Sequence, residues 1–304
     1  MINARKFTEV HIEIEDKCPL DCLHCSSAIL RSVGGISFKT PEIIALLKSL
    51  NTELHVYLTG GEPFLHYNLA ALIKTITCQI NNVSVGIFTS GVGKGKKPIS
   101  LSDAQSLKYS GLSDCYVSLY HNTPKLHDLI TGMPGSYEIT CESICNLIRS
   151  GIDVKAHVVM TRYNYSDYEQ IIFRILDLGI SQVRVLRIVN TGNANSNWNE
   201  IGVSYATQDS IVRKIISNIS SYGSKVTVSG FPAEIECRPF SLSQKCQAGI
   251  TLLYISGDGN VYPCACTKNF EKFRIGHIFA PDNVAEFIDN KEEFFNNDCL
   301  NPVS

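Results

Sequence analysis

The sequence predicts an α/β fold, a partial and open (β/α)6 barrel. Six short runs with strand-like alternation are each followed by an amphipathic helical run, within about 220 residues. Such alternation is typical of parallel strands joined by right-handed crossovers. Six units are too few to close an eight-stranded barrel, so we expect it to stay open. Functional residues should then lie at the C-terminal ends of the strands.

The first four units have clear signals. Alternating apolar and polar residues predict strands at 9–15, 53–59, 83–89 and 114–120. Apolar stripes predict helices at 40–50, 69–80, 101–110 and 137–151. The first of these helices should begin at Thr40 as N-cap, with Pro41 in its first turn. Gly151 is expected to end the fourth.

The second half repeats the scheme twice and then changes. Strands are predicted at 153–161 and 182–189, with helices at 168–179 and 207–220. After residue 225, two β-rich runs around "GDGN" predict a hairpin over 251–264, and a closing helix is expected at 283–295. We therefore predict two domains, a barrel over 1–230 and a small C-terminal β-hairpin and helix module over 231–304.

Composition narrows the class of protein. The formal net charge is −2, the hydrophobic fraction is 44% and the mean hydropathy is +0.03, which are values of an ordinary globular protein. No dense basic run indicates a nucleic-acid partner, and no apolar run is long enough to span a membrane. The start lacks a signal-peptide core, so we expect a cytoplasmic protein. Because the first strand begins close to Met1, we also expect no N-terminal leader-peptide-binding domain.

The chain has 12 cysteines, and their distribution is uneven. In a reducing compartment, cysteines are more often metal ligands, catalytic thiols or buried hydrophobes than disulfides. Cys78, Cys141 and Cys145 fall on predicted outer helices, where buried inert thiols are expected. The others gather mainly in two groups, at 18–25 and in the last quarter of the chain. Two metal centres would explain this pattern.

The first group, Cys18, Cys22 and Cys25, forms a CxxxCxxC loop directly after the first predicted strand. A structural zinc site has four protein ligands, and no fourth Cys or His stands at the usual offset. His24 lies between two of the cysteines, where joining them on one metal would strain the loop. The pattern favours a [4Fe–4S] cluster with three thiolate ligands and one open iron, with structural zinc or unrelated thiols as the alternatives.

With this loop, the chain resembles the radical S-adenosylmethionine (radical SAM) superfamily over nearly its whole length, which implies a partial TIM-like barrel. In that family the open iron binds S-adenosylmethionine, and one electron cleaves it to methionine and a 5′-deoxyadenosyl radical. The radical then removes a hydrogen atom from the substrate. The resemblance implies that Cys18, Cys22 and Cys25 bind the catalytic cluster and that His24 lies near the adenine of the cofactor.

A second motif, "GGEP" at Gly60, Gly61, Glu62 and Pro63, matches the family at the end of the second predicted strand. The glycines would let the backbone approach a ligand closely, and Glu62 would accept hydrogen bonds from an ammonium group.

Three further positions follow from the resemblance at later strands. It implies cofactor contacts for Ser90, Ser118 and Lys155, with the alternative that Ser118 and Lys155 merely fill or rim the barrel. Many family members have an acid two residues after the serine, where this chain has Tyr120, and this difference weakens the expected hydroxyl contacts.

The last quarter of the chain resembles the SPASM and twitch modules, which carry auxiliary [4Fe–4S] clusters. Cys246, Gly259 and Cys264 match the opening of these modules, and the hairpin would bring the two cysteines together. The resemblance implies one auxiliary cluster held by Cys237, Cys246, Cys264 and Cys299, with a zinc-bound tail as the alternative. Cys266 competes with Cys237 for the fourth ligand position, and the one that is not a ligand could return a hydrogen atom to the substrate.

The resemblance implies two [4Fe–4S] clusters, S-adenosylmethionine and an electron donor such as flavodoxin or ferredoxin. The predicted function is modification of a ribosomally made peptide by cross-linking, epimerisation or oxidation. Two alternatives stay open: oxidation or rearrangement of a small molecule such as an amino sugar or nucleotide, and a non-catalytic iron–sulfur or zinc binding protein.

Overall fold

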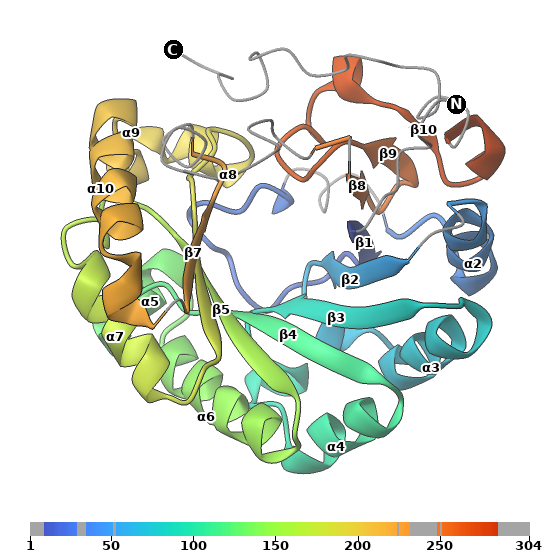
Figure 1. Cartoon of the computed structure of the whole chain (residues 1–304), viewed down its shortest axis with the longest axis horizontal. Coiled ribbons are helices and arrows are strands. Elements are labelled where there is room, and N and C mark those ends of the chain that lie inside the picture. Colours follow the sequence, from blue (N-terminus) through green and yellow to red (C-terminus); the bar gives the residue numbers. More distant parts are fainter. Residues whose placement is uncertain are drawn as a thin grey trace.

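The computed structural model describes residues 9–28, 35–50, 53–223, 225–231, 248–249 and 251–284. Within these residues one ten-stranded sheet runs through the molecule in the order β10-β9-β8-β1-β2-β3-β4-β5-β6-β7. The strands from β8 through β1 to β7 pair in parallel, and β9 and β10 add antiparallel pairs at one end. The sheet curves into an open barrel (Figure 1). The strands are β1 (Glu9–Glu15), β2 (Leu54–Gly60), β3 (Val83–Thr89), β4 (Leu112–Ser118), β5 (Asp153–Val159), β6 (Gln182–Leu186), β7 (Val226–Ser229), β8 (Leu252–Ile255), β9 (Asn260–Tyr262) and β10 (Gly276–His277).

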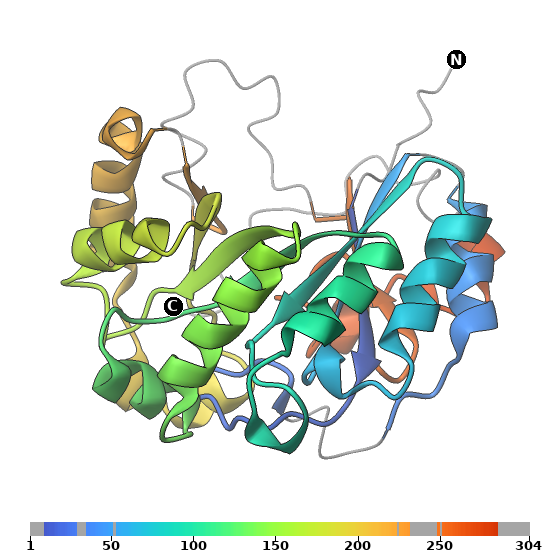
Figure 2. The same cartoon turned by 90° about the horizontal axis from the view of Figure 1, so that it is seen from below.

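Helices follow the strands and cover the outer side of the curved sheet, as Figure 2 also shows from below. The helices are α2 (Thr40–Ser49), α3 (Leu69–Gln79), α4 (Leu101–Tyr109), α5 (Pro124–Thr131), α6 (Ser136–Arg149), α7 (Tyr168–Asp177), α8 (Asn193–Ser196), α9 (Trp198–Ile201) and α10 (Tyr205–Ser217). The six predicted strand–helix units are therefore confirmed, and the barrel is open. Pro41 lies in the first turn of α2, as its fixed φ favours, but the N-cap is Lys39, one residue before the predicted Thr40.

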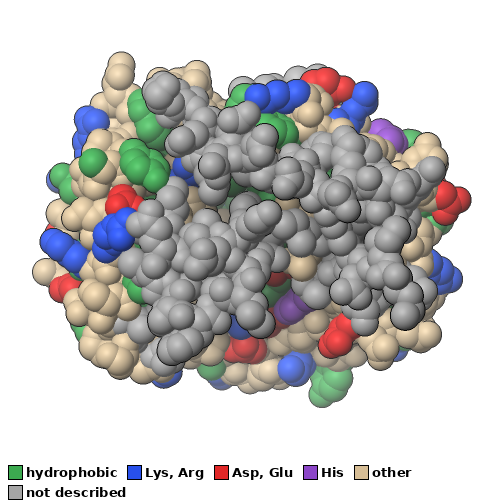
Figure 3. All heavy atoms as spheres, turned by 45° about the horizontal axis from the view of Figure 1, so that its top comes forward, with side chains coloured by type: hydrophobic (Ala, Val, Ile, Leu, Met, Phe, Trp, Pro, Cys, Tyr) green, Lys and Arg blue, Asp and Glu red, His purple; other side chains and the backbone are tan. Residues whose placement is uncertain are grey.

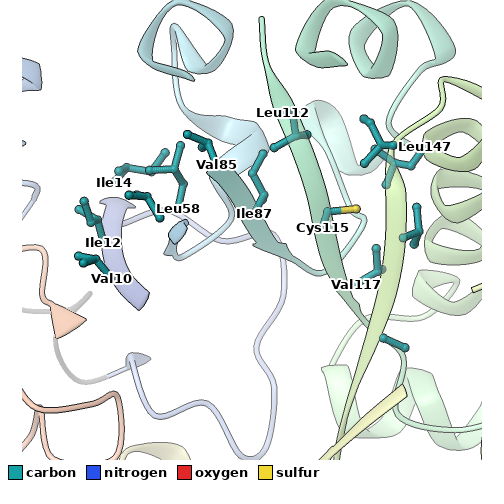
Figure 4. Packing of buried hydrophobic residues seen from close by; sticks show 14 of the residues in the cluster. Val10, Ile12, Ile14, Leu58, Val85, Ile87, Leu112, Cys115, Val117 and Leu147 are labelled. Carbon is teal, nitrogen blue, oxygen red and sulfur yellow. The ribbon is translucent and has the colours of Figure 1, made fainter. Parts of the chain in front are cut away.

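The hydrophobic core lies between the sheet and these helices. On β1 the apolar residues Val10, Ile12 and Ile14 alternate with polar ones and are 0%, 0% and 4% exposed. They pack in one cluster with the outward residues of the neighbouring strands and the apolar stripes of the helices (Figure 4). Fully burying such a side chain contributes roughly 1.5–3 kcal/mol. The two-residue period of the strands therefore sends apolar side chains to the helices and the others into the barrel.

The end of the chain differs from the sequence prediction in two ways. A seventh parallel strand, β7, pairs with β6, where only a change of pattern was expected after residue 225. The predicted hairpin does form, as β8 and β9, but β8 pairs in parallel with β1 and so extends the barrel sheet. The closing helix predicted at 283–295 lies almost wholly outside the described residues. The division into two domains at residue 230 stays a prediction.

Charged side chains of both signs are visible on the described part of one face. Around the rim of the view in Figure 3, Lys and Arg side chains lie interspersed with Asp and Glu. Among the described residues, no helix combines the length and apolar character needed to cross a bilayer.

Candidate active site

The inner face of the sheet carries aromatic and polar side chains, in contrast to its apolar outer face. The ring of His11 on β1 lies edge-on to Tyr57 of β2, Phe88 of β3 and Tyr254 of β8. The ring centroids are 5.7, 4.8 and 6.2 Å from that of His11. Four strands thus bring rings into one cluster inside the barrel, where each such contact adds about 0.5–1.5 kcal/mol to the burial of its rings.

An ion pair occupies the N-terminal half of the barrel. Lys155 of β5 donates from Nζ to Asp114 of β4 over 2.9 Å, and the hydroxyl of Tyr57 donates to the same carboxylate over 3.0 Å. Burial by itself would raise the pKa of Asp114, but hydrogen bonds from His55, Ser113 and Lys155 bring it below its usual range. The structure therefore places Lys155 in an ion pair inside the barrel, and its cofactor contact stays a prediction.

A histidine that sequence reasoning missed lies nearer the C-terminal ends of the strands. His157 of β5 is the register partner of Ser118, the last residue of β4. Its ring stacks on Tyr116 with centroids 4.1 Å apart, and its buried Nε2 has no hydrogen-bond partner among the described residues. Burial, reinforced by Arg184, lowers the pKa of His157 far below its usual value, so the ring is neutral at neutral pH. The alternation of apolar and polar residues in "VKAHV" is the sequence feature that could have placed His157 on the inner face of the sheet.

The cysteine loop, residues 16–28, leaves the end of β1 and is held by backbone hydrogen bonds on two sides. On one side, the amide of Asp21 donates to the carbonyl oxygen of Thr131 at the end of α5, over 3.0 Å. On the other, the amide of Asn193 after β6 donates to the carbonyl oxygen of Cys25, also over 3.0 Å. Two distant parts of the barrel therefore fix the loop through its backbone.

All three cysteines of the loop are half-buried and lie near the hydroxyl of Tyr120. Burial raises the pKa of Tyr120 well above its usual value, and the thiols of Cys22, Cys25 and Cys18 raise it further. Within the described ranges, no three His, Cys, Asp or Glu side chains are grouped closely enough to hold a single metal ion. An iron–sulfur cubane binds each thiolate through a separate iron, which requires wider spacing. Three thiols on one backbone-fixed loop are a donor set that fits such a cluster.

His24 of the cysteine loop packs against Tyr120. Its ring lies edge-on to Tyr120, with centroids 4.6 Å apart at an interplanar angle of 81°. Burial, together with the nearby His127, lowers the pKa of His24 to about 4, so it is neutral at pH 7. Its contact with an adenine ring stays a prediction.

The two glycines of "GGEP" allow the end of β2 to pack against the cysteine loop. The amide of Gly61 donates to the carbonyl oxygen of Glu15 over 2.6 Å. A Cβ on Gly60 would lie 2.3 Å from that oxygen, and a Cβ on Gly61 would lie 2.1 Å from the carbonyl oxygen of Lys17. No side chain fits at either position. The nearest neighbour of each glycine is thus backbone, at Glu15 of β1 and at Lys17 of the loop, and the approach of a ligand to these glycines stays a prediction.

Glu62 joins the ends of β2 and β3. Its side chain is fully buried and accepts hydrogen bonds from the amide of Ser90 at 2.8 Å and from its hydroxyl at 2.6 Å. The hydroxyl of Thr89 donates over 2.6 Å, and Pro63 follows in a short 3₁₀ turn over Pro63–Leu65. Burial raises the pKa of Glu62, although the hydrogen bonds from Ser90 and Thr89 oppose that rise. Glu62 therefore orients Ser90, and both of its oxygens are occupied by the chain itself.

A second buried carboxylate, Glu13 of β1, was missed in the sequence. It accepts hydrogen bonds from Ser27 of the cysteine loop, from Tyr254 of β8 and from Lys268. The only sequence signal was polar alternation in "VHIEIE", because Lys268 lies 255 positions away in the chain.

Two cysteines of the predicted auxiliary cluster region are described. Cys264 and Cys266 lie half-buried in the turn after β9, where the amide of Thr267 donates to the carbonyl oxygen of Cys264 over 3.2 Å. Cys237, Cys246 and Cys299 fall outside the described residues. The ligand set of the auxiliary cluster stays a prediction.

Known proteins are similar to this chain along most of its length. It is 22% identical to the AdoMet-dependent heme synthase of Oleidesulfovibrio alaskensis, covering 83% of this chain and 68% of the relative. It is 23% identical to the subtilosin biosynthesis protein AlbA of Bacillus subtilis, covering 88% of this chain and 56% of AlbA. A probable GTP 3′,8-cyclase of Methanocaldococcus jannaschii is 25% identical and covers 86% of each chain. The chain thus spans between about half and most of the length of these relatives.

Solved structures share the fold. Streptococcus suis SuiB, in its complex with the precursor peptide SuiA, matches with a TM-score of 0.72 at 17% identity, covering 94% of this chain and 65% of SuiB. In sequence, the protein-family model of the Radical SAM superfamily matches residues 12–175, which is more than half of the chain. This match includes the cysteine loop and the "GGEP" turn. The open parallel barrel, the three-cysteine loop at its C-terminal edge and the family match lead to one conclusion: the chain belongs to the radical SAM superfamily of enzymes.

Proposed function

We propose that this chain cleaves S-adenosylmethionine reductively and modifies a peptide by removal of a hydrogen atom. The observation that carries the proposal is the cysteine loop, fixed by backbone hydrogen bonds at the C-terminal edge of an open parallel barrel. When bound there, a [4Fe–4S] cluster with one open iron supplies the electron that splits the sulfonium cofactor. Cys18, Cys22 and Cys25 would hold that cluster.

The residues around the loop have roles that follow from their contacts. The buried carboxylate of Glu62 fixes the hydroxyl of Ser90, and Ser118 ends the neighbouring strand. These hydroxyls lie at the C-terminal ends of β3 and β4, where they would bind polar groups of the cofactor. His24 and His157, neutral because of burial, add rings without adding charge. These two neutral rings would line the space beside the cofactor without placing a further charge there.

The peptide substrate is supported by relatives. AlbA acts in bacteriocin biosynthesis, and SuiB binds the precursor peptide SuiA. The small-molecule alternative is supported by the heme synthase and the probable GTP cyclase. The similarity to all of these is comparable, so the choice between them rests on the substrate experiment below.

The proposal includes one auxiliary [4Fe–4S] cluster in the C-terminal region, held by Cys237, Cys246, Cys264 and Cys299. Such a cluster would bind the substrate or carry electrons. With this ligand set, the thiol of Cys266 would donate the hydrogen atom in an epimerisation. If Cys266 binds the cluster in place of Cys237, the thiol of Cys237 would be the donor. A flavodoxin or ferredoxin would supply electrons to the first cluster.

The cleavage proposal is tested by reconstituting the protein with iron and sulfide without air. After reduction and addition of S-adenosylmethionine, 5′-deoxyadenosine should accumulate. The Cys22→Ala variant should make none, whereas Cys145→Ser should match the unmodified protein. Cys145 is exposed on α6, and Cys78 is exposed as well, so the expected burial of these two thiols is wrong. A non-catalytic binding protein would produce no 5′-deoxyadenosine in any of these samples.

The substrate class is tested with the genes that neighbour this one. If they encode a short peptide, that peptide is incubated with the reconstituted protein and its mass is measured. A change that matches loss or rearrangement of hydrogen atoms would support peptide modification. Neighbouring sugar or nucleotide genes, with an unchanged peptide, would favour the small-molecule alternative.

A further inference from the structure

We propose that four residues tie the cysteine loop to the turn that carries Cys264 and Cys266, and that Lys268 is the positioning residue at their centre. The four, Glu13, Ser27, Tyr254 and Lys268, are called the buried lock below. Its significance for electron or hydrogen transfer rests on the proposed function, since that function places metal ligands in both segments. The lock itself is defined by contacts within the chain.

The contacts of the lock form a closed network. The ammonium of Lys268 donates to Glu13 Oε1 over 3.0 Å, to the hydroxyl of Ser27 over 2.5 Å and to that of Tyr254 over 2.9 Å. Ser27 donates to Glu13 Oε1 over 3.0 Å, and Tyr254 donates to the same oxygen. The amide of Gly257 donates to the other carboxylate oxygen over 2.8 Å. The three hydrogens of one ammonium therefore bind three different segments of the chain.

All four members are withdrawn from water. The exposed fractions are 4% for Glu13, 3% for Lys268, 3% for Tyr254 and 9% for Ser27. A charged pair buried to this degree requires close geometry and additional hydrogen bonds, and apolar residues of similar volume are often no less stable. What the ion pair adds is a defined position for each partner. The lock is therefore better suited to fixing geometry than to adding stability.

The lock joins the two segments directly beside their cysteines. Ser27 comes two positions after Cys25, and Lys268 comes two positions after Cys266. A second contact lies alongside, because Asn269 Nδ2 donates to the carbonyl oxygen of Ser26 over 3.2 Å. Two adjacent residues of one segment thus bind two adjacent residues of the other. Any shift of the turn relative to the cysteine loop must break this pair of contacts.

A coupling of this kind is reciprocal. If the lock holds both segments, loosening it from the side of the cysteine loop must loosen the turn, and the reverse must also hold. A residue that only stabilises its own surroundings would change its own segment alone. This difference provides the test.

The experiment measures backbone hydrogen exchange in metal-free protein, in segments 16–28 and 264–270. Ser27→Ala removes the hydroxyl that the cysteine loop contributes, and with it the hydrogen bonds to Glu13 and Lys268. The double variant Glu13→Gln/Lys268→Met removes both charges together, so neither is left buried alone. Lys272→Met, an exposed lysine four positions further along, is the matched control.

We expect Ser27→Ala to speed exchange in segment 264–270, and the double variant to speed it in segment 16–28. Each increase should be about tenfold or more, as loss of a hydrogen bond to a charged group implies. Lys272→Met should leave both segments unchanged. Exchange that rises only in the mutated segment, or in neither, would overturn the proposal. Because the measurement needs neither metal nor cofactor, its outcome is independent of whether the chain cleaves S-adenosylmethionine.

Discussion

Glu13 and Glu62 are two buried carboxylates near the C-terminal ends of adjacent strands, yet the chain stabilises them differently. Glu62 is held by hydroxyl and amide donors alone, and burial raises its pKa. Glu13 also faces the ammonium of Lys268. Burial would raise its pKa too, but Lys268 and Tyr254 outweigh that effect, and the pKa is lowered.

The difference shows how the same residue type serves two purposes on one edge of the barrel. Neutral donors from the end of β3 orient Glu62 at the end of β2, and burial raises its pKa because no buried cation lies beside it. A buried cation fixes Glu13 in its charged form and joins segments that are far apart in sequence. The first arrangement shapes the rim of the site, and the second fixes the position of the C-terminal turn.

The largest effect should come from removing the cation beside Glu13. Lys268→Met leaves a buried carboxylate without its counter-charge, and such losses cost about 3–5 kcal/mol of the free energy of unfolding. Adding Glu13→Gln should restore most of this loss. Urea unfolding of the metal-free variants measures both. If the single variant is as stable as the unmodified protein, the contrast between the two carboxylates is wrong.

Next in size is the packing of β2 against the cysteine loop. Gly61→Ala places a Cβ against the carbonyl oxygen of Lys17, and forced overpacking costs about 1–3 kcal/mol. The loop should shift, so iron uptake on reconstitution should fall together with stability. Gly95→Ala is the matched control, because nothing lies within 4 Å of a Cβ there. Its positive φ gives it a small strain of its own, without an effect on iron uptake. Equal iron uptake by both variants would contradict the inferred role of Gly61.

The pH dependence of stability should differ in sign between the two carboxylates. The raised pKa of Glu62 contributes stability that is present below its ordinary value of 4.5 and is lost as pH rises through the folded-state pKa. The lowered pKa of Glu13 contributes stability that is present above 4.5 and is lost as pH falls through the folded-state pKa.

Glu62→Gln should therefore remove a decline toward higher pH, and the double variant Glu13→Gln/Lys268→Met should remove a decline toward lower pH. Urea midpoints between about pH 3 and pH 8 measure this. If the urea midpoint changes with pH in the same way in both variants, the environments of Glu62 and Glu13 are equivalent and the contrast between them is wrong.

The smallest effect is expected in the N-terminal half of the barrel. Lys155 keeps 20% of its side-chain surface exposed, and its buried partner Asp114 also has hydrogen bonds with His55, Tyr57 and Ser113. Asp114 therefore keeps three partners when Lys155 is removed, and Lys155→Met should cost less of the free energy of unfolding than Lys268→Met, as measured by urea unfolding. A loss as large as that of Lys268→Met would mean that both ion pairs serve the same structural purpose.

Sequence periodicity was sufficient for the repeated part of the fold. Strand β3 was predicted at its observed bounds, because "VSVGIFT" alternates and turn residues flank it. Strand β7 was missed, since four residues between a helix and a change of pattern give too short an alternation to read. The pairing of β8 with β1 was missed for another reason: nothing local indicates which distant edge a hairpin strand will join.

For the site, the sequence by itself determined the family, because CxxxCxxC and "GGEP" depend on spacing within short segments. It also determined which faces of the strands are apolar. Only the tertiary structure decided that Glu62 binds Ser90, that Lys155 pairs with Asp114, and that Lys268 reaches Glu13 from the far end of the chain. The physical reason is that a motif reports local chemistry, whereas the partner of a buried charge is chosen by the packing of segments that meet only when the whole sheet has formed.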